Sequence, residues 1–67
     1  MDKLTDYLKE YFKVNNISQY AIEKRTGIKQ SKISLSLNNK RKFTADELLS
    51  IAKSFEIDLN KIKEIIK

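Results

Sequence analysis

The sequence predicts an all-α fold of five helices in one small domain. Apolar residues recur at intervals of three and four along most of the 67 residues, which is the period of a helix with one buried face. No stretch alternates apolar and polar residues for long enough to predict a strand. The chain has one glycine and no proline, and no linker, repeat or low-complexity segment divides it. We therefore expect residues 1–67 to form a single domain.

The first helix has its apolar residues on one face, at Leu4, Leu8, Tyr11 and Phe12. Asp2 is placed to cap its start, because a side-chain oxygen can accept the free N–H groups of a first turn. Asn15 and Asn16 are expected to end it, since Asn tolerates the left-handed conformation that terminates a helix.

The second and third helices are short and are separated by a turn. Ser18 is a good cap for the second helix, and the only glycine, Gly27, closes it. The third helix is expected over residues 30–37. It faces inward through Ile33 and Leu37, which lie one turn apart.

The last two helices also begin at clear signals. Thr44, followed three residues later by Glu47, predicts a capping box at the start of the fourth helix. Its apolar positions are Leu48, Ile51, Ala52 and Phe55. Asp58 is the expected cap of the fifth helix. The apolar stripe of that helix consists of Leu59, Ile62 and Ile66, with Ile65 beside it.

The composition excludes several classes of function. The chain has no Cys and no His, so it can form no disulfide, no zinc site of Cys or His, and no catalytic triad with His as base. We therefore expect neither an enzyme nor a cofactor. Three carboxylates share one side of the first helix, but neighbouring lysines argue against a metal site there. These acids are Asp2, Asp6 and Glu10.

Nothing in the sequence predicts secretion or a membrane span. Acidic residues interrupt the N-terminal stretch in which a signal peptide would be apolar. The longest apolar run, over 20–22, has three residues, far fewer than a bilayer requires. We expect a cytoplasmic protein.

The positive charge is concentrated in the middle of the chain. The net charge is +5, with 14 Lys plus Arg against 9 Asp plus Glu. Residues 18–43 contain one acid and seven bases, whereas the segments on either side are nearly neutral. This pattern favours an anionic partner, nucleic acid first and a lipid surface second. Taken alone, it fits an ordinary solvated surface equally well.

Two short helices joined across a glycine, in the most basic part of the chain, have the layout of a helix-turn-helix. The segment SQYAIEKRTGIKQSKISLSLNN, residues 18–39, resembles the phage lambda repressor and Cro family of regulators, the XRE family. The resemblance extends over roughly residues 4 to 62. It implies a five-helix lambda-repressor-like domain whose second and third helices form the helix-turn-helix, in a bacterial or phage-encoded protein that binds double-stranded DNA.

The resemblance also implies roles for individual residues. The third helix would enter the major groove, where Gln30 can bond adenine, Lys32 can reach guanine or phosphate, and Leu35 can meet a thymine methyl. For Leu35, an ordinary exposed leucine is the alternative. The predicted base-reading residues are Lys29, Gln30, Ser31, Lys32, Ser34 and Leu35. The predicted phosphate-binding residues are Ser18, Gln19, Asn38, Lys40, Arg41 and Lys42.

The chain departs from the family pattern at several positions. An Arg and Glu pair that usually joins the first and third helices is replaced by Phe12 and Leu37. Exchanging both members of a buried ion pair for apolar side chains is often neutral or stabilising. Ser36 stands where an apolar residue is typical, which should weaken the packing of the helix pair. Asn39 replaces the usual Gly after the third helix.

We therefore predict a sequence-specific transcriptional regulator, a repressor that binds a pseudo-palindromic operator as a homodimer. The predicted dimer interface is Leu59, Ile62, Ile65 and Ile66, because this apolar stripe has no later element to cover it. No small-molecule ligand is expected; a protein antirepressor or a toxin would be a further partner. Two alternatives remain: the DNA-binding antitoxin of a toxin–antitoxin pair, and a protein-interaction or membrane-surface module that uses the same fold.

Overall fold

Five α-helices follow one another along the chain: α1 Lys3–Val14, α2 Gln19–Thr26, α3 Gln30–Leu37, α4 Ala45–Ser54 and α5 Leu59–Ile66. The computed structural model describes residues 3–66, leaving aside the side chains at positions 59, 63 and 66. Within these residues there is no strand, so the predicted all-α fold is confirmed. The predicted bounds of the third helix, 30–37, agree with α3.

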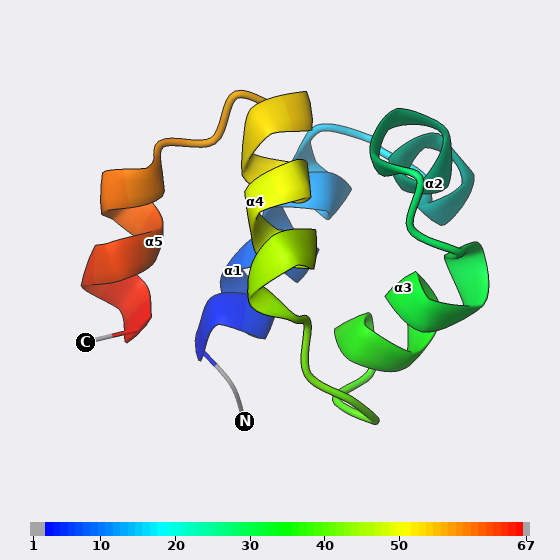
Figure 1. Ribbon diagram of the computed structural model, residues 1–67, viewed down its shortest axis with the longest axis horizontal. Helices are drawn as coiled ribbons and strands as arrows, with labels where there is room; N and C mark the ends of the chain where they lie inside the picture. The colour runs from blue at the N-terminus through cyan, green and yellow to red at the C-terminus, as the bar shows by residue number, and fades with distance from the viewer. Residues whose placement is uncertain (1–2, 67) are drawn as a thin grey trace.

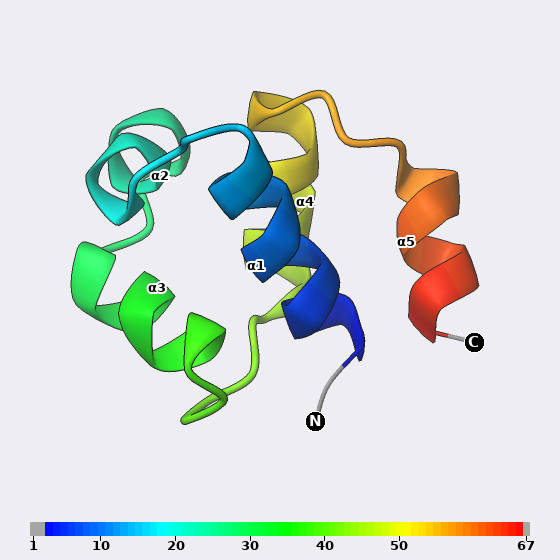
Figure 2. The ribbon, with the colours of Figure 1, turned by 180° about the vertical axis from the view of Figure 1, so that it is seen from behind.

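The helices are arranged around α1 and α4, which lie in the middle of the molecule. Helices α2 and α3 lie together on one side, and α5 lies on the other (Figure 1). The view from behind shows α1 beside α4, again between the α2–α3 pair and α5 (Figure 2). Helix α3 contacts both α1 and α2, and α5 contacts α1. The helix-turn-helix is therefore attached to the centre of the domain, while α5 is attached through α1.

A single apolar core joins all five helices and the turns between them. Its buried residues are Leu4, Leu8, Phe12, Ile22, Ile28, Ile33, Leu37, Ile51, Ala52, Phe55, Ile57 and Ile62. The ring of Phe12 meets that of Phe55 edge to face, with 5.4 Å between centroids. Phe12 and Leu37, the two departures from the family's ion pair, both belong to this core, as two apolar replacements should.

Side-chain caps define where three of the helices, α2, α4 and α5, begin, as the sequence predicts. The Ser18 hydroxyl accepts a hydrogen bond from the Ala21 N–H at 3.1 Å. Thr44 and Glu47 form the complete capping box, each side chain accepting a hydrogen bond from the other residue's backbone N–H. The Asp58 carboxylate accepts one from the Asn60 N–H at 2.9 Å. The predicted cap at Asp2 lies outside the described residues.

Left-handed residues define where the helices end. Gly27 follows α2 with φ of 80°, while Asn16 follows α1 with φ of 55° and Asn39 follows α3 with φ of 62°. Asn39 thus takes the conformation that Gly usually supplies after the third helix. Glu56 has the same conformation after α4, with φ of 54°. The sequence did not predict this last terminator, because Glu has no particular preference for the left-handed region.

Substituting Leu37 tests the apolar replacement of the ion pair. Leu37→Glu places a charge without a partner in the core, so the free energy of unfolding should fall by about 3 kcal/mol or more. Urea or thermal unfolding measures this loss. Leu35→Glu is the matched control, since Leu35 is 47% exposed on the opposite side of the same helix and should tolerate the charge. Equal stability of the two variants would show that Leu37 is not packed in the core.

Candidate nucleic-acid interface

The turn between α2 and α3 is held by the hydroxyl of Thr26. This hydroxyl donates a hydrogen bond to the Ile22 carbonyl at 2.7 Å and accepts one from the Ile28 N–H at 3.2 Å. Ile28 itself is buried in the core. The N–H of Gly27 donates to the Glu23 carbonyl at 2.8 Å. These contacts close α2 and fix the direction in which the chain enters α3.

Helix α3 presents one side to the core and the other to solvent. Ile33, Ser36 and Leu37 are buried. On the open side, four of the predicted base-reading residues are exposed and Ser34 is half-buried. These four are Gln30, Ser31, Lys32 and Leu35. The structure thus places the predicted base-reading residues of this helix on one accessible face, as insertion into a groove requires.

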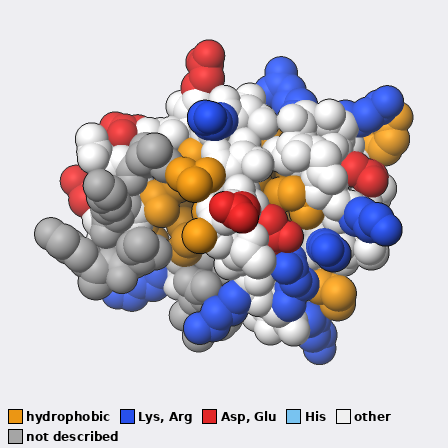
Figure 3. All heavy atoms as spheres, viewed as in Figure 1, with side chains coloured by type: hydrophobic (Ala, Val, Ile, Leu, Met, Phe, Trp, Pro, Cys, Tyr) orange, Lys and Arg blue, Asp and Glu red, His pale blue; other side chains and the backbone are white. Residues whose placement is uncertain are grey.

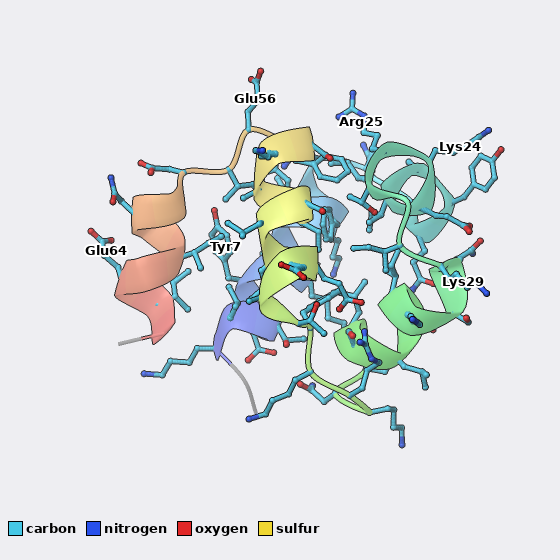
Figure 4. The ribbon with its side chains drawn as sticks, viewed as in Figure 1. Tyr7, Lys24, Arg25, Lys29, Glu56 and Glu64 are labelled. Carbon is cyan, nitrogen blue, oxygen red and sulfur yellow. The ribbon has the colours of Figure 1, made fainter. Side chains whose placement is uncertain are left out.

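Lys29 immediately precedes this face and is also exposed. It makes no side-chain cap for α3, since an ammonium has no acceptor for the free N–H groups of a first turn. Figure 4 shows Lys29 projecting outward beside α3, on the same side of the molecule as Lys24 of α2. We use the name reading surface for the six predicted base-reading residues, Lys29, Gln30, Ser31, Lys32, Ser34 and Leu35.

The start of α2 lies next to this surface in the helix-turn-helix. Ser18 is exposed and caps α2 through its oxygen, which leaves the hydroxyl hydrogen able to donate to another group. Gln19 is half-buried in the first turn. The first turn of a helix presents unpaired N–H groups, which suit a phosphate.

The connection from α3 to α4 carries further basic residues. Lys40 and Lys42 are exposed, as phosphate contacts must be. Asn38 is exposed too, but one amide N–H already donates to the Ser34 carbonyl at 2.9 Å. Figure 3 shows Lys and Arg side chains gathered along the edge of the molecule formed by α3 and this connection. Part of the central excess of charge seen in the sequence therefore lies along this edge, while Lys24 and Arg25 lie on α2.

Arg41 behaves differently from the lysines on either side. Its guanidinium donates hydrogen bonds to the Ser36 hydroxyl at 2.8 Å and to the two carboxylate oxygens of Glu47 at 3.1 and 3.3 Å. The Arg41 side chain is only 25% exposed and that of Glu47 only 14%. Arg41 was predicted to bind phosphate, but in this structure three of its N–H donors are directed into the protein. We call the contacts among these three residues the Arg41 clamp.

Ser36 was expected to weaken the packing of the helix pair, but the structure gives its buried hydroxyl a hydrogen-bond partner. The residue is completely buried, yet its hydroxyl accepts the hydrogen bond from Arg41. Among the described residues, no buried polar side-chain atom is left without a hydrogen-bond partner. A buried hydroxyl costs free energy mainly when it is unpaired, so Ser36 is accommodated.

The charge of Glu47 is stabilised by these contacts. Burial alone would raise the pKa of this carboxyl, but several contacts outweigh it. The backbone N–H of Thr44 and the Arg41 guanidinium donate hydrogen bonds to the carboxylate, and the charges of Arg41 and Lys32 attract it. Together they hold the pKa below its ordinary value of 4.5. Glu47 therefore serves at once as the cap of α4 and as the counter-ion of Arg41.

Comparison with known protein families adds to this geometry. A family model for the Cro/C1-type HTH DNA-binding domain matches residues 7–67, nearly the whole chain. The chain belongs to this family. No curated protein and no solved structure shows significant similarity to the chain.

Family membership confirms the helix-turn-helix assignment and the class of partner. A Cro/C1-type domain is a regulatory module that binds double-stranded DNA, and the family is not one of enzymes. No helix within residues 3–66 is long and apolar enough to cross a membrane.

The predicted dimer residues of this Cro/C1-type domain are only partly available to a partner. Ile62 is 6% exposed and belongs to the core, so little of its side chain is available to a partner. Ile65 is half-buried and packs against the same core. The side chains of Leu59 and Ile66 lie outside the described residues. An exposed leucine that the sequence did not single out, Leu49 of α4, is 48% accessible.

The clamp is the part of the site that sequence reasoning missed. A signal was available in Ser36, a polar residue at a position of α3 that faces inward. Such a residue requires a donor or acceptor nearby, and Arg41 is five positions further along the chain. Glu47 was identified only as a cap, although its carboxylate has room to accept several hydrogen bonds.

The lowered pKa of Glu47 predicts a specific pH dependence of stability. A carboxyl with a lower pKa in the folded state contributes stability above its unfolded pKa, and this is lost as the pH falls through the folded pKa. As the pH falls from 7 to about 3, wild type should therefore lose more stability than Glu47→Gln. Urea unfolding at a series of pH values measures both curves. All other carboxyl groups are the same in the two proteins. An equal loss of stability in both as the pH falls would therefore contradict the lowered pKa of Glu47.

Proposed function

We propose that this Cro/C1-type domain is a transcriptional repressor that recognises a specific sequence of double-stranded DNA. The observation that carries the proposal is the division of α3 into a buried side and an open side. The buried side holds the helix in place through Ile33 and Leu37, and the open side bears the reading surface. A rigid helix with free polar and apolar side chains on one face suits the major groove.

The chemistry of the reading surface supports sequence preference. The Gln30 amide can bond the adenine edge in two places, and the Lys32 ammonium can donate to guanine. Leu35 offers a methyl contact for thymine from a side chain that is 47% exposed. Contacts of these three kinds distinguish between base pairs, whereas contacts to phosphate do not.

A second set of residues supports binding to the backbone. Ser18 and Gln19 are placed at the start of α2, and Lys40 and Lys42 follow α3. Asn38 is exposed, and its amide group donates to the Ser34 carbonyl at 2.9 Å and more weakly to the Ser34 hydroxyl at 3.5 Å. These residues would set the position and register of the domain on the duplex.

We further propose that two copies bind one operator. An eight-residue helix is only about 12 Å long, so α3 can contact only a few base pairs. A two-fold pair of domains would place two such helices about 34 Å apart on a pseudo-palindromic site. The surface around α5 supports this pairing through the partly open Ile65, and the exposed Leu49 on α4 offers further apolar area.

Repression is the simplest regulatory outcome of such binding. A protein that occupies a site on DNA excludes other proteins from it without any chemical step. The family is one of DNA-binding regulators, which supports this proposal.

Selection from a library of random duplexes tests the function directly. The wild-type chain should enrich a defined motif with two-fold symmetry, because each α3 reads one half-site. Failure to enrich any motif, together with binding to anionic vesicles, would favour the alternative of a membrane-surface module.

Substitutions within the selected motif should separate reading from positioning. Gln30→Ala should weaken binding by about 1 to 3 kcal/mol and relax preference at one base pair, because a bond to a base edge is lost. Lys40→Ala should weaken binding to all sequences alike and lower the slope of log affinity against log salt by roughly one. Titrations of DNA at several salt concentrations measure both effects. If Lys40→Ala changed the preferred sequence, the assignment of the two roles would be wrong.

The dimer is tested by the stoichiometry on DNA. Sedimentation of the wild-type chain with a duplex that carries the full motif should give two protomers per duplex. A duplex with one half-site should bind more weakly, since the contact between protomers contributes only when both are bound. A monomer in free solution and a single protomer on the full motif would exclude the dimer.

A further inference from the structure

The Arg41 clamp connects three segments of the chain through one side chain. Ser36 lies in the last turn of α3, Arg41 lies in the connection, and Glu47 lies in the first turn of α4. Because the guanidinium is planar and its donors are fixed in direction, it holds its two partners in a defined geometry. The clamp therefore sets how the connection leaves α3 and how it reaches α4.

The residues on either side of Arg41 are the two lysines proposed to bind phosphate. Exposure alternates along the connection: Lys40 and Lys42 are exposed, while Arg41 is half-buried and Phe43 packs against the core. The path before Lys40 is also defined, since its N–H donates to the Leu35 carbonyl at 2.8 Å. With Arg41 held inward, both lysines are presented to solvent beside the reading surface.

Turning Arg41 outward to bind phosphate would break these contacts. If the guanidinium turned outward, the Ser36 hydroxyl would remain completely buried without its donor. The Glu47 carboxylate would lose its counter-ion while it is 14% exposed. Both losses oppose the movement, because an unpaired buried polar group is costly.

We propose that Arg41 is a positioning residue for DNA binding, which holds Lys40 and Lys42 in register with α3 through its contacts with Ser36 and Glu47. The proposal rests on the DNA-binding function of the domain. Arg41 acts through the two lysines and is not itself a ligand of phosphate. Ordering them before binding lowers the conformational entropy that binding must remove.

Glu47 supplies the sharpest test. Its negative charge and its role as the anchor of Arg41 predict opposite effects of its removal on the affinity for DNA. Removing an acid close to a DNA-binding surface should strengthen binding if only long-range attraction matters. Removing the anchor of Arg41 should instead weaken binding, because the connection becomes free to move. Glu47→Gln separates the two, since the Gln side chain can still complete the capping box at Thr44.

The experiment measures affinity for a short duplex of random sequence by fluorescence anisotropy at several salt concentrations. The proteins are wild type, Glu47→Gln, Arg41→Lys and the milder Ser36→Ala, each at a temperature at which circular dichroism shows it folded. Lys40→Gln is combined with Arg41→Lys to measure coupling between the two positions. Lys29→Gln is the matched control, because Lys29 lies at the other end of α3 and has the same charge.

We expect Glu47→Gln and Arg41→Lys each to bind about fivefold more weakly than wild type, with Ser36→Ala between them and wild type. Arg41→Lys should leave the salt slope unchanged, because no phosphate contact is exchanged. The loss caused by Lys40→Gln should shrink at least about twofold in the Arg41→Lys background, whereas the loss caused by Lys29→Gln should stay the same. If Arg41 had a purely structural role, Arg41→Lys would change the melting temperature. The losses of affinity caused by Lys40→Gln and by Lys29→Gln would then be the same in both backgrounds.

Three results would overturn the proposal: tighter binding by Glu47→Gln, wild-type affinity of Arg41→Lys, or an unchanged cost of Lys40→Gln in that background. The second would mean that Lys replaces Arg as a phosphate ligand. Absence of salt-dependent binding by the wild-type chain would be a different failure. It would remove the DNA-binding function on which the proposal rests.

Discussion

Helix α3 depends on the burial of its inner side. An isolated helix of eight residues is not stable in water, because it contains too few hydrogen bonds to offset nucleation. Helix α3 therefore exists because Ile33 and Leu37 are buried in the shared core. The Thr26 hydroxyl, which bridges α2 and the turn, fixes its direction. Stability of the fold and orientation of the reading surface thus have a common source.

The two ends of α3 are held by different kinds of contact. Its beginning follows a turn in which buried Ile28 joins the core, while its end is followed by left-handed Asn39 and the polar Arg41 clamp. A polar bridge is directional, whereas apolar contacts permit small rotations. The end of the helix nearest the lysines is therefore the end with the more specific geometry. The same carboxylate, that of Glu47, anchors both this bridge and the start of α4.

The sequence predicted features that depend on neighbouring residues and missed those that depend on tertiary contacts. The caps at Ser18 and Thr44 and the terminator at Gly27 act within one turn, so local patterns were sufficient. The inward direction of Arg41 depends on its partners Ser36 and Glu47, and the basic charge of the connection alone does not indicate it. The role of Ile62 depends on tertiary contacts in the same way: an apolar stripe shows that one side of α5 is covered, but not whether α1 or a second protein covers it.

The separation of inner and outer residues along α3 has an evolutionary consequence. Positions 33, 36 and 37 hold the helix, while positions 30, 31, 32 and 35 face solvent. Mutations at the outer positions open no cavity and leave no buried polar group without a partner, so they cost little folding free energy. Related chains can therefore acquire different target sequences while they keep the same scaffold. Divergence of binding specificity can precede any change in the core.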